Sequence, residues 1–197
     1  SSVQDGFGDA LGLKQSDFEV VCEYVGGGFG SKLGGRGKEV MLAAKLSQKF
    51  KRPAYVMCNP WEEHLDTGNR PSSMTSVKLG LKKDGSVVGG EIRTWGGTGV
   101  GRGGGGVAIP SGRYDFQGVD KKHNDVSFNG GGPRPFRAPG HPQAVFAEEL
   151  MLDEAAALIG MDPLTIRRKL LKDDVYREMM EMGARLIGWN ERKPTGS

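Results

Sequence analysis

A glycine-rich run between an alternating apolar segment and a segment of helix formers constrains the fold more than any other feature of this sequence. Residues 25–40 are VGGGFGSKLGGRGKEV, with seven glycines. The pattern predicts a strand at Phe18–Val25, a helix from Lys38 to Phe50 and a second strand at Arg52–Cys58. Because glycine has no side chain and tolerates positive φ, its backbone can approach another group closely. The sequence therefore predicts a β-loop-α-β unit whose loop backbone closely approaches another chemical group.

Two further regions complete the predicted fold. Thr75–Trp95 consists of two alternating runs around an Asp84-Gly85 turn, which should supply the positive-φ residues of an antiparallel hairpin. Gly96–Gly132 has little periodicity and is long for a loop inside a compact domain. We predict an α+β fold with a mixed sheet and C-terminal helices, in a single domain over residues 1–197.

The C-terminal part is predicted to be helical from Pro142 to Trp189. Its first helix is apolar nearly all round, so we expect it to be mostly buried, with a polar stripe formed by Glu148, Glu149 and Asp153. The next helix should begin with Asp162 as N-cap and Pro163 at the first helical position.

Composition limits the classes of function. A net charge of +3 with interspersed signs is too small for a nucleic-acid-binding surface. No segment reaches the roughly 18 apolar residues of a membrane span, and the first residues do not resemble a secretory signal. We therefore expect a cytoplasmic protein, with a periplasmic location left open, that binds no nucleic acid and has no membrane span.

Nucleotide-binding motifs explain the glycine run poorly. A dinucleotide fingerprint starting at Gly26 would need a third glycine where Ser31 stands, and one starting at Gly28 would need it where Leu33 stands. A Walker A loop needs Ser or Thr after Gly-Lys, but Glu39 follows Lys38. A loop without any ligand remains an alternative on these residues alone.

Two strings taken together support a more specific interpretation. GGGFGSK (26–32) and RPFRAPGHPQ (134–143) resemble the molybdopterin-binding subunit of the xanthine dehydrogenase and aldehyde oxidase family, the molybdenum hydroxylases. Further family-like segments in the same order extend the resemblance over nearly the whole chain. The resemblance implies the first molybdopterin-binding domain of such a subunit, present either as a fragment or as one piece of a split enzyme.

The resemblance also implies a cofactor and the residues around it. The cofactor would be molybdenum-molybdopterin, as such or as the cytosine dinucleotide. Its binding residues would be Gly27, Gly28, Phe29, Gly30, Arg137 and Ala138. Phe29 and Arg137 would lie near the oxo ligands of the molybdenum without ligating the metal through their side chains. The two cysteines cannot ligate [2Fe–2S] clusters, so these clusters and FAD are expected in partner domains or chains.

The implied reaction is oxidation of an aldehyde or an N-heterocycle, with water as the oxygen source. Leu33 and Pro139 would line the substrate pocket, at positions where purine hydroxylases of the family have glutamate and phenylalanine. No residue matches the catalytic glutamate of the family, so the catalytic base is unknown and the isolated chain is expected to be inactive.

The expected partners are the remaining molybdopterin-binding domain or subunit, an iron–sulfur subunit, a flavin subunit and a small-molecule substrate. The alternative is a non-catalytic assembly or binding module of the same fold without cofactor.

Overall fold

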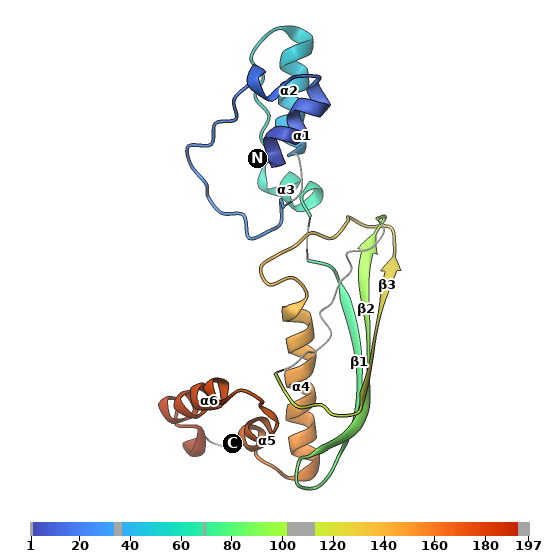
Figure 1. The fold of residues 1–197 in the computed structure, drawn as a ribbon, viewed down its shortest axis with the longest axis vertical. Helices are drawn as coiled ribbons and strands as arrows, with labels where there is room; N and C mark the ends of the chain where they lie inside the picture. The colour runs from blue at the N-terminus through green and yellow to red at the C-terminus, as the bar shows by residue number, and fades with distance from the viewer. Residues whose placement is uncertain (1, 34–36, 69, 102–112, 193–197) are drawn as a thin grey trace. The chain divides into compact units, whose positions relative to one another are not determined.

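The computed structural model describes residues 2–33, 37–68, 70–101 and 113–192, and its contacts divide the chain into two compact units (Figure 1). The first unit comprises Ser1–Ser72, Gly97–Gly105 and Asp125–Pro139. The second unit comprises Ser73–Gly96, Gly106–Asn124 and Gly140–Ser197. A single domain over residues 1–197 stays a prediction. Among the described residues, no helix is long and apolar enough to cross a membrane.

The sheet has three strands, β1 (Ser73–Leu81), β2 (Val87–Gly99) and β3 (Val119–Ser127), in the order β1-β2-β3. β1 and β2 are antiparallel. β2 and β3 run in the same direction, as Figure 1 shows, with the N–H of Gly90 donating to Gly118 and the N–H of Phe128 donating to Gly99. The sheet is therefore mixed, which confirms the predicted α+β class. β3 was not predicted, because its VDKKHNDVS sequence is mostly polar.

The turn between β1 and β2 forms where the sequence predicted it. Gly85 has a φ of +83°, and its N–H donates to the carbonyl of Lys82 at 2.9 Å. Asp84 does not have positive φ; instead its carboxylate accepts from the N–H of Ser86 at 3.0 Å and from the hydroxyl of Ser86 at 2.7 Å. The hairpin is confirmed, but only its glycine needs the left-handed conformation.

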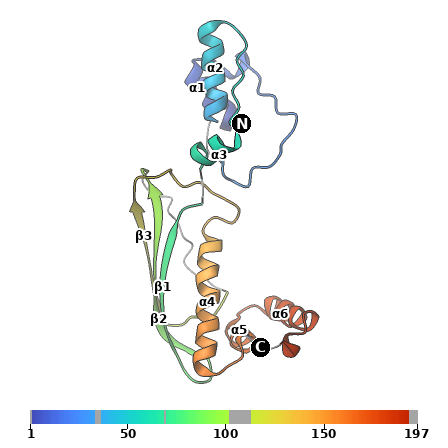
Figure 2. The same cartoon turned by 180° about the vertical axis from the view of Figure 1, so that it is seen from behind.

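Helix α4 (His141–Ile159) lies along one face of the sheet and contacts β1, as both views show (Figures 1 and 2). It is followed by α5 (Pro163–Leu170), α6 (Asp174–Leu186) and the short 3-10 helix η2 (Trp189–Glu191). Asp162 caps α5 by accepting from Leu164 and Thr165, as predicted. The main core of this unit consists of Tyr114, Leu152, Ala155, Ala156, Ile166, Leu170 and Leu171.

The predicted polar stripe of α4 is wrong at Glu148, whereas the side chains of Glu149 and Asp153 are 33% and 54% exposed. Glu148 is only 2% exposed and pairs with Arg113, whereas the apolar side chains of Phe146 and Leu158 are 69% and 87% exposed. An ion pair with the partly exposed guanidinium of Arg113 makes burial of the carboxylate possible, and sequence periodicity does not reveal such a partner. One side of α4 therefore leaves apolar surface uncovered.

The first unit contains α1 (Ser2–Leu11), the 3-10 helix η1 (Gln15–Asp17), α2 (Lys38–Phe50) and α3 (Pro60–Asp66). α2 agrees with the predicted helix, and it contacts α1. α3 was not predicted, although Asn59 and Glu62 form a capping box around its first turn and Pro60 occupies the first position. These residues were the local signal for this helix.

The predicted strands at Phe18–Val25 and Arg52–Cys58 are wrong. Neither segment pairs with another strand among the described residues. Their larger side chains are exposed, with Tyr24 at 90% and Tyr55 at 84%. A strand forms only when another backbone satisfies its N–H and C=O groups, and an alternating apolar pattern cannot supply that partner. The β-loop-α-β unit therefore reduces to α2 between two segments without regular structure.

Candidate functional site

The first loop of the candidate site runs from Gly27 to Leu33 and has unusual backbone conformations. Gly27, Phe29 and Gly30 have φ values of +134°, +51° and +96°. The N–H of Ser31 donates to Gly28 at 3.2 Å, and the N–H of Leu33 donates to Gly30 at 2.9 Å, so the segment forms consecutive tight turns. Positive φ at Phe29, a residue with a side chain, costs roughly 1–3 kcal/mol and indicates that surrounding contacts hold the loop.

The second loop, from Arg134 to Gly140, lies directly against the first. The main-chain N–H of Arg137 donates to the carbonyl oxygen of Phe29 at 2.7 Å. The next residue, Ala138, also has positive φ, at +54°. The rings of Phe29 and Phe136 lie with their centroids 6.3 Å apart and tilted by 39°. The structure thus brings together parts of the two strings that the sequence singled out, and the residues in contact, Phe29, Phe136 and Arg137, all belong to the first unit.

Gly28 and Gly30 of the first loop have different surroundings, so the lack of a side chain matters for a different reason at each position. A β-carbon at Gly30 would lie 2.8 Å from the carbonyl oxygen of Pro135, so this glycine permits the contact between the two loops. A β-carbon at Gly28 would meet no heavy atom within 4 Å. Open space at Gly28 leaves room for a ligand beside the backbone, whereas the space at Gly30 is already filled by protein.

The hydrogen-bond donors of this site suit an oxygen-rich, anionic group. The N–H groups of Gly28, Phe29 and Gly30 have no acceptor among the described residues. Arg137 is exposed, and its guanidinium pairs with no described side chain. Main-chain N–H groups in turns and an arginine fork bind phosphate and other anionic oxygens rather than a bare cation. The residues present therefore fit a cofactor that offers oxygen atoms.

Arg70 also contacts this site, although no sequence motif indicated it. Its Nη2 donates to the carbonyl oxygen of Arg137 at 3.0 Å. Its guanidinium also lies 5.2 Å from the centroid of the Phe136 ring. The sequence shows only an arginine before a proline in TGNRPSS, and nothing local indicates where such a side chain docks.

Lys32 belongs to the first loop but turns to other partners. Its Nζ lies 2.7 Å from Glu63 of α3 and 3.8 Å from Glu39 of α2. The hydrogen bond to Glu63 raises the pKa of Lys32 above its usual value. Lys32 therefore ties the loop to two helices and is not the cation that faces a ligand.

The two predicted substrate-pocket residues are both exposed. Leu33 is 66% exposed, and its carbonyl accepts a long hydrogen bond from Arg134 at 3.5 Å. Pro139 follows Ala138 at the end of the second loop. The structure thus places one residue in each loop, and their role toward a substrate stays a prediction.

The carboxylates considered as catalytic bases all have structural partners. Glu62 accepts from the N–H of Asn59, and Glu63 accepts from Lys32. Glu148 pairs with Arg113 at 2.7 Å, while Glu149 accepts from the Tyr114 hydroxyl at 2.9 Å and from Arg167 at 2.7 Å. Each of these four carboxylates already has a partner within the protein. The contacts therefore do not identify any of them as the catalytic base.

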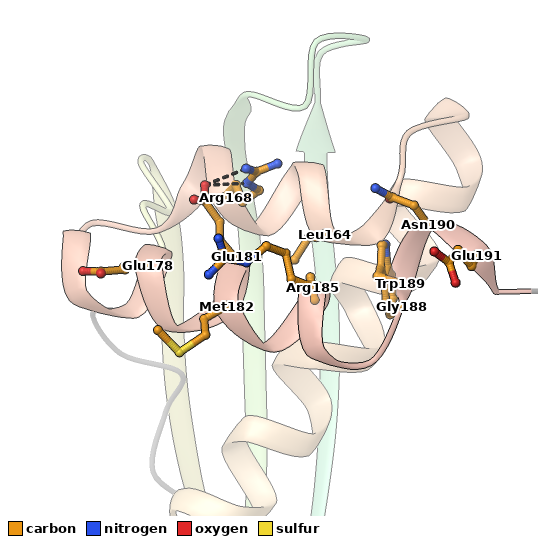
Figure 3. Close-up of a pocket in the computed structure, with 11 residues that line it drawn as sticks. Leu164, Arg168, Glu178, Glu181, Met182, Arg185, Gly188, Trp189, Asn190 and Glu191 are labelled. Carbon is orange, nitrogen blue, oxygen red and sulfur yellow. Dashed lines mark hydrogen bonds and ion pairs between the residues drawn. The ribbon is translucent and has the colours of Figure 1, made fainter.

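A cavity of about 610 Å³ lies in the second unit between α5, α6 and η2 (Figure 3). Figure 3 shows Arg168 of α5 pointing toward Glu181 of α6, with which it forms an ion pair at 2.6 Å. None of the lining residues belongs to the two loops. Because this cavity lies apart from both loops, it adds no chemistry to the candidate site.

Sequence comparisons place the whole described site within one family match. Residues 1–171 match the family model described as the molybdopterin cofactor-binding domain. The chain is 28% identical over 202 residues to the aldehyde oxidoreductase molybdenum-binding subunit PaoC of Escherichia coli K12, with 94% of this chain and 27% of the relative covered. It is 29% identical over 213 residues to the xanthine dehydrogenase molybdenum-binding subunit of Escherichia coli O157:H7, with the same coverage. The chain thus spans about a quarter of the length of these relatives.

Solved structures show the same fold. Aldehyde oxidoreductase from Desulfovibrio gigas matches with a TM-score of 0.76 and 22% identity, covering 98% of this chain and 24% of the other. Quinoline 2-oxidoreductase from Pseudomonas putida 86 matches with a TM-score of 0.81 and 21% identity, covering 95% of this chain and 27% of the other. At these identities the likeness establishes the fold.

Proposed function

Because this chain belongs to the molybdopterin cofactor-binding domain family, we propose that its two loops hold one side of a molybdenum-molybdopterin cofactor. The observation that supports this proposal most directly is the 2.7 Å hydrogen bond from the N–H of Arg137 to the carbonyl of Phe29. This bond joins the two strings and places an exposed arginine on the same loop contact as the N–H groups of Gly28 and Gly30. Residues 27–30 would supply main-chain donors, and Arg137 would supply charge.

When bound, the cofactor supplies two-electron oxidation chemistry at its molybdenum. The residues of this chain bind and orient it. Arg137 would donate charge-assisted hydrogen bonds to anionic oxygens, because a guanidinium keeps its charge at any physiological pH. Gly28 would allow close approach, since no protein atom lies within 4 Å of where its side chain would be. Phe29 and Ala138 hold the turns that aim these groups.

We further propose that the complete protein oxidises an aldehyde or a less polar N-heterocycle, with oxygen from water. The support is Leu33 and Pro139, which offer apolar surface where purine-oxidising relatives would need polar recognition. Iron–sulfur and flavin partners would accept the electrons. Because the chain covers only 27% of the lengths of the two Escherichia coli subunits, the isolated chain is expected to bind the cofactor weakly and to be inactive.

The test is the molybdenum content of the full-length protein assembled with its partners. Arg137→Ala should lose cofactor, because removing charge-assisted hydrogen bonds costs about 1.5–3 kcal/mol, or roughly ten- to a hundredfold in affinity. Arg52→Ala is the matched control, an exposed arginine outside the two loops of the same unit. Full molybdenum content in Arg137→Ala would reject the proposed role of this loop. An assembled protein that is metal-free and fully functional would instead favour a non-catalytic binding module.

A further inference from the structure

We propose that Arg70 is a positioning residue that fixes the second loop against the first; this inference rests on the proposed cofactor function. Arg70 makes two contacts with consecutive residues of the second loop. Its Nη2 donates to the carbonyl of Arg137 at 3.0 Å, and its guanidinium lies 5.2 Å from the centroid of the Phe136 ring. One side chain thus holds both the backbone and an aromatic ring of the loop.

The contacts of Arg70 continue into the first loop. Phe136, which Arg70 covers, has its ring 6.3 Å from that of Phe29. Arg137, whose carbonyl accepts from Arg70, donates its own N–H to the carbonyl of Phe29 at 2.7 Å. Arg70 is therefore connected to Phe29 twice, through the ring of Phe136 and through the backbone of Arg137. Phe29 is the non-glycine residue with a left-handed backbone in the described part of the glycine run. Arg70 acts on the site through these two residues.

Apolar burial does not hold the two loops together. Phe29 is 61% exposed and Phe136 is 41% exposed. Ala138, directly after Arg137, has a strained φ of +54° and is also exposed. Residues in such conformations persist only when their surroundings determine them. With little burial available, the hydrogen bond from Arg70 to the Arg137 carbonyl and the contact of Arg70 with the Phe136 ring hold this part of the loop in place.

Arginine suits this role better than lysine. A planar guanidinium can stack on a ring with its face and donate from its edge at the same time. An ammonium group can approach the Phe136 ring or the Arg137 carbonyl, but it does not combine face and edge in one plane. Arg70→Lys should therefore restore only part of the effect, whereas a role that needs positive charge alone would be restored fully.

The experiment measures hydrogen–deuterium exchange in the full-length protein within its assembled complex, prepared without cofactor. The amide of Arg137 reports the loop contact directly, because it donates to Phe29. Arg70→Met should speed exchange of this amide by about tenfold, the effect of losing one net hydrogen bond. Arg70→Lys should be intermediate, and Arg52→Met should match the unmodified protein. The melting temperature should stay unchanged in all variants, since the contacts lie on the surface of one unit.

The same variants are then loaded with cofactor, and molybdenum loss during prolonged dialysis is followed. Arg70→Met should lose molybdenum faster than Arg52→Met.

Unchanged exchange at Arg137 would overturn the positioning role whether or not the cofactor proposal holds. Faster exchange with unchanged molybdenum retention would show a loop clamp with no effect on the cofactor, which also overturns it. Full retention in Arg137→Ala would reject the proposed function itself. If Arg70→Met does not fold, the same exchange and molybdenum-retention measurements are made on Arg70→Lys and compared with the unmodified protein. Faster exchange and faster molybdenum loss in Arg70→Lys would then support the positioning role, and no change would overturn it.

Discussion

A β-carbon on Gly30 would lie 2.8 Å from the carbonyl oxygen of Pro135, whereas a β-carbon on Gly28 would meet no heavy atom within 4 Å. Gly30 also has a φ of +96°. Two glycines of one motif therefore have separate roles: Gly30 lets the two loops meet, and Gly28 leaves the outer side of the loop open. Substitutions at these positions should separate loop assembly from cofactor binding.

Gly28→Ala should leave the stability of the protein unchanged and lower its molybdenum content, because the added methyl group enters open space that the cofactor would use. Gly30→Ala or Gly30→Val should lower stability by at least about 1 kcal/mol and also remove the cofactor, because the loops can no longer meet. Thermal unfolding of cofactor-free protein and metal analysis of loaded protein distinguish the two. Equal molybdenum content in Gly28→Ala and the unmodified protein would contradict the role given to Gly28.

Lys32→Ala should keep the cofactor. The side chain pairs with Glu63 and Glu39, and both partners of the closer pair are partly exposed, so its loss should cost about 0.2–1 kcal/mol of stability. Molybdenum content and thermal unfolding of Lys32→Ala measure the two effects, with Lys45→Ala on an exposed position of α2 as control. A clear loss of molybdenum would mean that Lys32 turns toward the cofactor in the loaded protein.

Glu148 should make stability depend on pH. Burial raises the pKa of its carboxyl above 4.5, and the Arg113 guanidinium only partly opposes this rise. The folded state therefore binds the proton more tightly than the unfolded state, so this stabilisation is present below about pH 4.5 and is lost as pH rises through the raised pKa. One carboxylate oxygen, Oε1, also lacks a hydrogen-bond partner among the described residues.

Glu148→Gln removes this titration. Relative to the unmodified chain, the variant should gain stability as pH rises from about 4.5, whatever constant offset arises from losing the ion pair with Arg113. Urea unfolding between pH 4 and pH 8 measures the difference. Glu154→Gln is the control, since Glu154 is exposed on the same helix. Parallel stability curves for Glu148→Gln and the unmodified chain would rule out the raised pKa.

The assembled enzyme should prefer an aromatic aldehyde over xanthine. Leu33 and Pro139 present apolar surface, and a buried purine donor or acceptor without a partner costs about 1–3 kcal/mol, or roughly five- to a hundredfold in kcat/KM. Steady-state kcat/KM values for the two substrates test this directly. A preference for xanthine would show that polar groups outside Leu33 and Pro139 form the pocket.

Local chemistry made several features predictable from sequence. Helix formers gave α2, Asp162 and Pro163 gave the start of α5, and Gly85 gave the hairpin turn. In each case the deciding hydrogen bonds connect residues a few positions apart. The family was also predictable, because GGGFGSK and RPFRAPGHPQ are specific strings, and the match over residues 1–171 confirms it.

Features that depend on distant partners were not predictable. The apolar alternation of Phe18–Val25 indicated a strand, but no described strand pairs with it. Glu148 was expected on a polar face, yet Arg113, from a distant segment, allows it to be buried. The polar strand β3 forms because β2 offers it a parallel edge.

The sequence by itself determined the two site strings, the turn glycines and the helix caps, because these depend on local conformational preference and on residue identity. Only the tertiary structure decided that Arg137 meets Phe29, that Gly30 faces Pro135 and that Arg70 covers Phe136. The physical reason is that these contacts join segments far apart along the chain. Their formation depends on how the whole first unit packs, and no local pattern encodes which backbone carbonyl a distant arginine will reach.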